Sequence, residues 1–138
     1  QQDEPVAVQV GAALSRWVHP RQQHYVTSTG ALTGDRLTYR LDTVVASMLT
    51  QAPEGIASIR FAECSRGLDQ MLAEAGLCDA EGYAHERTAG WLYAKEQPGT
   101  VPVYRCMDEQ QGTHFASSAP DCEKLGDKEF LLGYGLAP

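Results

Sequence analysis

The sequence is poor in basic side chains and has no long apolar run. Only 11 of its 138 residues are Lys or Arg, against 18 Asp or Glu, which gives a net charge of −7. Recognition of a phosphate backbone needs clustered basic residues, so we expect no nucleic-acid partner. No stretch approaches the ~20 apolar residues of a membrane helix, so we predict no membrane span.

Motifs that carry chemistry are also missing. The chain has no Gly-x-Ser-x-Gly elbow, no phosphate-binding glycine loop and no Cys-x-x-Cys spacing. Ser117 and Ser118 follow His114 closely, and Asp108 and Glu109 are adjacent, but nothing in the sequence joins them into a catalytic pair or triad. We therefore predict a protein that is not an enzyme and has no catalytic residues, metal site or cofactor.

Four cysteines are present, an even number that permits three pairings on paper. We favour Cys64 with Cys78 and Cys106 with Cys122, because each bond then closes a short loop within one of three internal repeats of the chain. Loops of this size contribute about 3 kcal/mol each in the chain-entropy model. Zinc is the competing interpretation, but no two cysteines have zinc-ligand spacing and the histidines do not cluster beside them. Disulfides predict an oxidising compartment.

The first ten residues are expected to lie outside the repeats. The chain lacks an initiator Met and opens with the polar residues 1–5. This is typical of a secreted chain after signal-peptide removal, or of a domain excised from a longer protein. Residues 6–10 alternate like a strand that could add to the edge of a neighbour's sheet. We predict a secreted, extracellular location.

An arginine and a later acidic residue recur three times along the chain. The arginines are 44 and 45 positions apart and the acids 44 and 43. The recurring pairs are Arg16 with Asp42, Arg60 with Glu86, and Arg105 with Glu129. A Pro-containing joint precedes the second and third copies. We divide one domain, residues 1–138, into a tail or strand (1–10) and three repeats of about 44 residues: unit 1 (11–54), unit 2 (55–99) and unit 3 (100–138).

Each unit is predicted as strand, turn, strand, variable loop and strand. The loop at 68–77 has apolar residues at partly helical spacing, which predicts a short helix. Gly90 and Gly133 align with Ala46, which indicates a crowded point that admits little side chain. One such unit cannot bury its own apolar face, but three closing around an axis can. The predicted fold is mainly β with short helices, a pseudo-threefold β-trefoil-like domain.

Unit 3 carries a resemblance to a known family. Its segments are Val101-Pro102-Val103-Tyr104-Arg105-Cys106, Gly112-Thr113-His114-Phe115-Ala116-Ser117-Ser118 and Leu132-Gly133-Tyr134. They resemble an uncharacterised repeat family of secreted bacterial proteins with a Gly-Asp-His-Phe-Tyr-Thr-like core. The resemblance extends over residues 14–136 but is close only in unit 3, and unit 2 replaces the His-Phe pair. It implies a secreted module suspected of ligand or carbohydrate binding, with no catalytic residue to carry over.

Two histidines head the candidate ligand site. His24 and His114 are taken as equivalent, since an aromatic residue and small hydroxyl residues follow each. An aromatic face can pack on a sugar ring while His, Ser and Thr supply hydrogen bonds. The predicted ligand-binding residues are His24, Tyr25, Thr27, His114, Phe115 and Ser117. The alternative is that the histidines pack under their own turns and serve the fold.

The arginine and acid pairs are predicted to be structural. The arginines could instead form a site for an anionic ligand. Three matched copies of both signs favour ion pairs within or between units, because the guanidinium fork fits a partly buried carboxylate.

These patterns together predict a secreted, non-catalytic recognition module that is lectin-like and binds a glycan or other cell-surface ligand. The alternative is a structural or adhesive extracellular subunit that self-associates or docks on a surface protein. A third interpretation is a trefoil-type protease inhibitor acting through the loop at 29–36.

Overall fold

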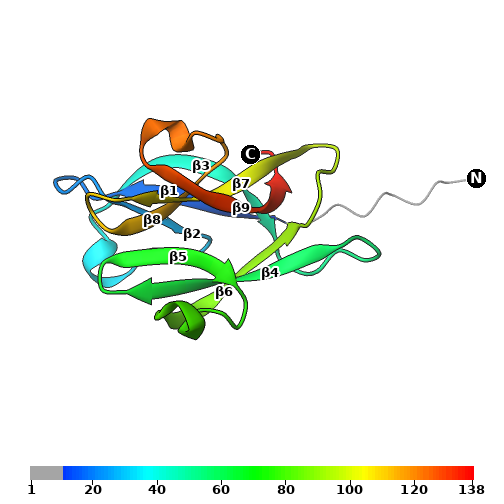
Figure 1. Cartoon of the computed structure of the whole chain (residues 1–138), viewed down its shortest axis with the longest axis horizontal. Helices are drawn as coiled ribbons and strands as arrows, with labels where there is room; N and C mark the ends of the chain where they lie inside the picture. The colour runs from blue at the N-terminus through cyan, green and yellow to red at the C-terminus, as the bar shows by residue number, and fades with distance from the viewer. Residues whose placement is uncertain (1–10) are drawn as a thin grey trace, which may run out of the picture.

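The computed structural model of the chain describes residues 11–138. It is 55% strand and 7% helical, and its only helical segments are isolated 3-10 turns. The prediction of a mainly β protein is confirmed. The strands form one antiparallel nine-stranded sheet that bends strongly (Figure 1).

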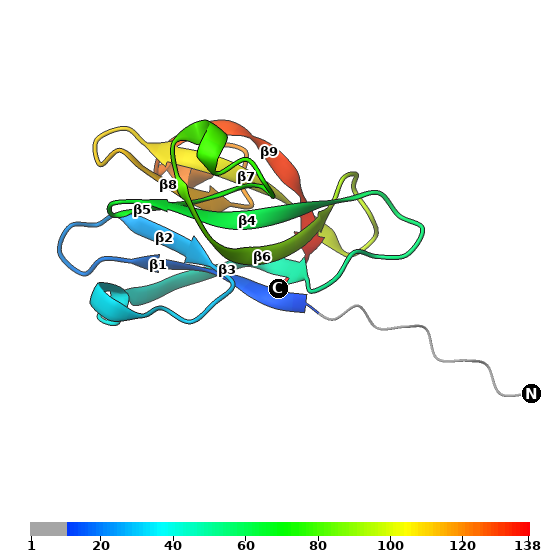
Figure 2. The ribbon, with the colours of Figure 1, turned by 90° about the horizontal axis from the view of Figure 1, so that it is seen from below.

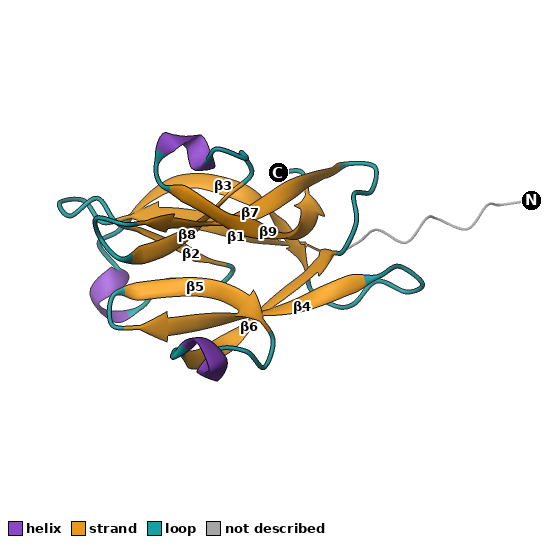
Figure 3. Ribbon diagram, in the orientation of Figure 1, coloured by secondary structure: helices purple, strands orange, loops and turns teal. Residues whose placement is uncertain are grey.

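The same order of elements recurs three times along the chain: two strands, a 3-10 turn and a third strand. The strands are β1 (Gly11–Val18), β2 (Tyr25–Ser28), β3 (Arg40–Leu49), β4 (Ser58–Arg66), β5 (Asp69–Glu74), β6 (Ala84–Tyr93), β7 (Thr100–Asp108), β8 (Thr113–Ser117) and β9 (Asp127–Leu136). The turns are η1 (Gly34–Arg36), η2 (Asp79–Glu81) and η3 (Cys122–Lys124), and Figure 3 shows them outside the strands.

Strand pairing also follows one pattern in each unit. The first strand is the middle one: β1 pairs with β2 and β3, β4 with β5 and β6, and β7 with β8 and β9. The third strands then pair with one another through one residue pair each. These pairs are Ser47 with Leu136, Leu49 with Trp91, and Tyr93 with Tyr134. The three groups of three strands are thereby joined into one sheet, and the β-trefoil-like arrangement stays a prediction.

The strand register corrects the alignment of unit 2. Leu14 lies opposite Ala46, Phe61 opposite Gly90, and Val103 opposite Gly133. Two residues further on, the matching positions are held by Arg16, Glu63 and Arg105. The predicted equivalence of Arg60 with the other two arginines is therefore wrong by three residues. The offset between units 1 and 2 is 47 in the first strand but 44 in the third, because the connecting segments differ in length.

The crowded point predicted at the glycines is confirmed. A Cβ on Gly90 would lie 2.7 Å from the carbonyl oxygen of Leu49, and one on Gly133 would lie 2.8 Å from that of Tyr93. Both distances are below any normal van der Waals contact. The third strands of neighbouring units thus approach each other closely only because a side chain is missing there.

The short helix predicted at 68–77 is wrong. Residues 69–74 form β5, and all but the last of them are buried. A strand buried on both faces has a continuous run of non-exposed positions, and its apolar spacing can imitate that of a helix.

The core lies where the three units meet. Leu14, Phe61 and Val103, which the register makes equivalent, belong to one buried cluster with Leu72 and Ala116. The second strands β2, β5 and β8 contact one another, so the hairpin of each unit faces the other two (Figures 1 and 2).

Two disulfides join the predicted partners, Cys64 with Cys78 and Cys106 with Cys122. Each bond links the middle strand of its unit to the segment beside the 3-10 turn. Among residues 11–138, no helix has the length and apolar character needed to cross a membrane. The strand predicted at 6–10 lies outside the described residues.

Candidate functional site

The residues predicted to bind a ligand are largely inside the protein. Phe115 is 2% exposed and Ser117 is fully buried. His24, Thr27 and His114 are also buried, and Tyr25 is half-buried, with its ring 5.3 Å from that of Phe115. A sugar cannot stack on a ring that is already covered, so the expected exposed aromatic and hydroxyl face is not present at these positions.

His24 and His114 are not equivalent in the sheet. The register matches His114 with Tyr25, one residue beyond His24. The Nε2 atom of His24 lies 2.5 Å from the hydroxyl of Tyr39. Burial is the main cause that lowers the pKa of His24 below 6.5, followed by the charges of His19 and Arg36. His24 therefore packs within its own unit, in agreement with the alternative that the histidines serve the fold, and its partner is the hydroxyl of Tyr39.

His114 belongs to a buried polar cluster that joins β5 to β8. Its Nδ1 atom lies 2.6 Å from Oδ2 of Asp69, and its backbone N–H donates to Oδ1 of the same carboxylate at 2.6 Å. The hydroxyl of Tyr83 donates to Oδ2 at 2.5 Å, and Nε2 of His114 lies 3.3 Å from Glu129. Both ring nitrogens of His114 therefore face carboxylates.

The pKa values in this cluster follow from its contacts. Burial alone would lower the pKa of His114, but the hydrogen bond and charge of Asp69 raise it above 6.5. Burial would raise the pKa of Asp69, but hydrogen bonds from His114 and Tyr83 lower it below 3.8. Burial and the Asp69 carboxylate raise the pKa of Tyr83 to about 12. The folded state therefore favours a histidine cation paired with an aspartate anion.

The predicted ion pair in unit 1 is present. The guanidinium of Arg16 is buried and lies 2.6 Å from Asp42 and 2.7 Å from Glu123. Its hydrogen bond is also the main cause that lowers the pKa of Glu123. Because Glu123 belongs to unit 3, this arginine ties two units together.

Unit 3 contains the second predicted pair. Arg105 is buried, lies 2.8 Å from Glu129, and also lies 2.9 Å from Glu81 of unit 2. The third predicted pair is absent: Arg60 is exposed and bonds Thr88, while Glu86 is bonded by Ser65. The register explains this, since the buried position of unit 2 belongs to Glu63.

Glu63 is the residue that the sequence analysis missed. Its side chain is 3% exposed and lies opposite Arg87, which is 46% exposed and makes a 3.2 Å ion pair with it. Ser28 and Gln70 donate to its Oε1 at 2.8 and 2.9 Å, and the N–H of Thr29 donates to its Oε2 at 3.0 Å. An acid between two apolar residues of a strand, with an arginine on the paired strand, was the available signal.

Arg16, Arg105 and the Gln70 that bonds Glu63 each donate to a backbone carbonyl of another unit, across a seam between the units. The receiving carbonyls belong to Thr27, Leu72 and Ala116, which hold equivalent places in the register. Arg16 donates to Ala116 at 2.9 Å, Arg105 to Leu72 at 3.0 Å, and Gln70 beside Glu63 to Thr27 at 3.3 Å. We name the seams by the units that meet there: 1/2, 2/3 and 3/1.

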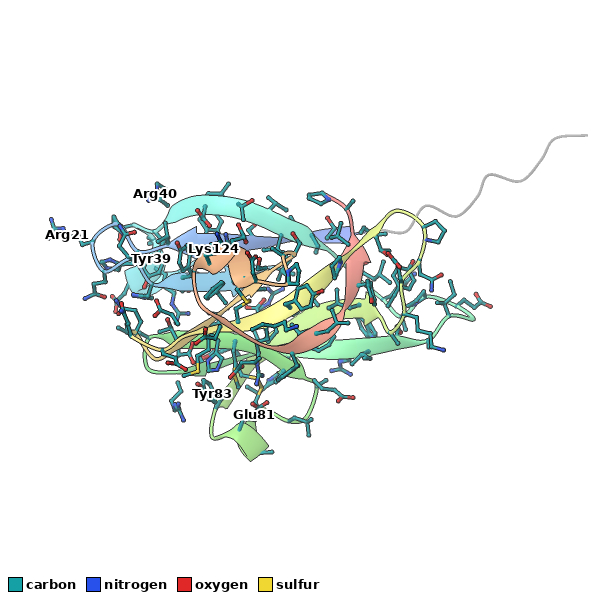
Figure 4. All side chains as sticks on the ribbon, turned by 45° about the horizontal axis from the view of Figure 1, so that its top comes forward. Arg21, Tyr39, Arg40, Glu81, Tyr83 and Lys124 are labelled. Carbon is teal, nitrogen blue, oxygen red and sulfur yellow. A yellow bond between two sulfur atoms is a disulfide. The ribbon has the colours of Figure 1, made fainter. Side chains whose placement is uncertain are left out.

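Seam 1/2 opens into a polar groove of about 280 Å³. Its lining includes Thr33, Arg36, Glu63, Gln70, Glu86 and Arg87. A connected row crosses it: Arg36 donates to Gln70 at 2.5 Å, and Gln70 donates to Glu63. A second hollow of about 270 Å³ shares Thr33, Arg36 and Glu86 with it and continues to Leu68. Tyr39, labelled in Figure 4, lines this second hollow.

The position of Arg87 depends on a glycine in the facing loop. A Cβ on Gly30 would stand 2.3 Å from Nη1 of Arg87. Any side chain there would push the guanidinium away from Glu63.

Comparisons of the chain with protein-family models, with curated proteins and with solved structures find no match. Within residues 11–138, no group of three or more His, Cys, Asp or Glu side chains is arranged to hold a metal ion.

Proposed function

We propose that the chain is a secreted, non-catalytic recognition module that binds carbohydrate in the polar groove at seam 1/2. The observation that carries this proposal is the fixed row of donors and acceptors formed by Arg36, Gln70, Glu63 and Arg87. This site replaces the buried residues around His114 and Phe115 as the place where a sugar would bind.

The chemistry of the groove suits neighbouring hydroxyl groups. Both hydrogen bonds that Arg87 makes within the described residues use Nη1, so Nε and Nη2 are left as donors for a ligand. Glu86 offers an exposed carboxylate as acceptor, and Thr33 an exposed hydroxyl. A sugar diol needs a donor and an acceptor at fixed separation, and side chains already held by their neighbours lose little entropy on binding.

A β-trefoil-like arrangement of the three units is part of the proposal. It is supported by the recurring order of elements, by the mutual pairing of β3, β6 and β9, and by the cross-seam bonds to three equivalent carbonyls. Secretion is supported by the two disulfides, and lectin-like recognition fits the secreted repeat family that unit 3 resembles.

A glycan array followed by titration calorimetry tests the proposal. We expect saturable binding of at least one saccharide, reduced at least tenfold by Arg87→Ala and by Gly30→Ala. Arg21→Ala is the matched control, since Arg21 lies in the β1–β2 turn and projects from the molecule in Figure 4. Thermal melts show whether each variant folds. An array without binders, or folded groove variants with unchanged affinity, would contradict the assignment.

A further inference from the structure

Seam 2/3 carries a second groove, of about 260 Å³, whose walls are mostly apolar. We call it the apolar groove. Its lining includes Ile59 and Phe61 of β4, Leu77, and Phe130 and Leu131 of β9. Leu77, Phe130 and Leu131 are 45%, 45% and 42% exposed. Large apolar side chains gathered around one hollow are typical of a surface that another molecule covers.

Carboxylates surround this groove. Its one guanidinium, Arg105, is already held by Glu81 and Glu129 and covered by the Phe130 ring at 4.4 Å. A third carboxylate, Glu74, lies exposed at the end of β5 and lines the groove. Its side chain makes no hydrogen bond or ion pair within residues 11–138. The rim therefore has negative charge in excess and one acid ready for a cation.

We infer that the apolar groove binds an extended peptide segment of a partner protein that carries an aliphatic or aromatic side chain beside a Lys or Arg. The apolar side chain would lie between Leu77 and Leu131, and the cation would pair with Glu74. A groove of about 260 Å³ has room for one or two side chains of such a segment.

Two other occupants fit the charge less well. A second copy of this chain would bring identical acidic rims together, at an overall net charge of −7 per copy. An anionic lipid surface would be repelled by Glu74 and Glu81. The peptide with a basic residue is the occupant that complements both the apolar wall and the acidic rim.

The test is a titration of the ¹⁵N-labelled full chain with capped pentapeptides of the form Gly-X-Lys-X-Gly, in which X is Leu, Ile, Phe or Trp. We expect saturable shifts of the amides of Glu74, Leu77 and Leu131 with at least one of them. Replacing the Lys of the peptide by Glu, or X by Ser, should weaken binding at least tenfold. Leu131→Ser should abolish the shifts and Glu74→Gln should reduce affinity about tenfold.

Leu41→Ser is the matched control, because Leu41 is 50% exposed and is not part of this groove. Absence of saturable shifts, equal binding of the Glu peptide, or shifts at another surface would overturn the inference. So would sedimentation of a dimer, or binding to anionic phospholipid vesicles, that Leu131→Ser removes. Sugar binding at seam 1/2 involves none of these variants, so the two proposals can fail separately.

Discussion

The polar groove and the apolar groove occupy matching places on two seams, yet their chemistry is opposite. At seam 1/2 the buried charge is Glu63, and Arg87 lies over it. At seam 2/3 the equivalent buried charge is Arg105, and the residue equivalent to Arg87 is Phe130, whose ring covers the guanidinium. A buried carboxylate is thus covered by a cation at one seam, and a buried guanidinium by an aromatic ring at the other. The two surfaces differ together with the buried charges beneath them.

Removing the buried cation at seam 2/3 should have the largest effect. Arg105→Ala would remove the ion-pair partner of Glu81, leave Glu129 with His114 alone and uncover the carbonyl of Leu72, so we expect a loss of about 3 kcal/mol in the free energy of unfolding. Arg60→Ala, at an exposed position, should cost less than about 0.5 kcal/mol. Urea denaturation of both variants gives the two values, and similar losses would mean that the register assigned to unit 2 is wrong.

At seam 1/2 Glu63 and Arg87 should contribute unequally to the free energy of unfolding. Glu63→Ala would strip the acceptor from Ser28, Gln70 and Thr29, which are donors at a buried site, and we expect a cost of about 2 kcal/mol. Arg87→Ala should cost less than about 1 kcal/mol, because water screens the ion pair of a half-exposed guanidinium and Glu63 keeps its other three donors. Chemical denaturation measures both. Equal costs would show that the pair, and not the acceptor network, stabilises this seam.

The two buried histidines should give stability opposite dependences on pH. Because the folded pKa of His24 is lowered, its contribution is complete above pH 6.5 and is lost as the pH falls. Because the folded pKa of His114 is raised, its contribution is complete below pH 6.5 and is lost as the pH rises through the folded pKa. In His24→Gln, the free energy of unfolding should therefore decline as the pH rises above 6.5 through the folded pKa of His114.

The reciprocal variant isolates the other histidine. In His114→Gln, stability should fall as the pH is lowered from about 7 to 5. If both variants kept the same pH profile as the wild type, the buried histidines would not be the groups that set it.

The smallest effect concerns the position that matches His24 and Asp69 in unit 3. This is Thr113, whose buried hydroxyl has no hydrogen-bond partner among residues 11–138, while His24 and Asp69 are bonded by Tyr39 and Tyr83. Thr113→Val removes the unsatisfied hydroxyl at constant shape, so we expect a gain of about 0.5 kcal/mol. Thermal melts detect it. A loss of stability would indicate that the hydroxyl has a partner such as a bound water.

The sequence predicted the features that depend on local pattern. Cysteine spacing predicted both disulfides, the recurring glycines predicted the close approach at Gly90 and Gly133, and two of the three ion pairs were found. These signals depend on residue type and short separation alone. The strand and turn pattern within each unit predicted the mainly β class, which is confirmed.

The polar groove could not be predicted, because its residues come together only through the register. The spacing of the acids aligned Glu86 of β6 correctly with Asp42 of β3. The same spacing made Arg60 the counterpart of Arg16, because the chain between the first and third strands is three residues shorter in unit 2 than in unit 1. That error hid Glu63. Burial was the other unknown: the motif around His114 has the composition of a sugar site, but β8 packs against β2 and β5 and covers it.

The pairing of β3 with β9 has a consequence for the order of the chain. Ser47 lies opposite Leu136, and a Cβ on Gly11 would stand 3.4 Å from the side chain of Leu136. Residues 11 and 136 are therefore spatial neighbours, and a short linker would join them without strain. We expect a circular permutant opened at the Pro53–Glu54 joint to form the same seams, so that any unit can be synthesised first.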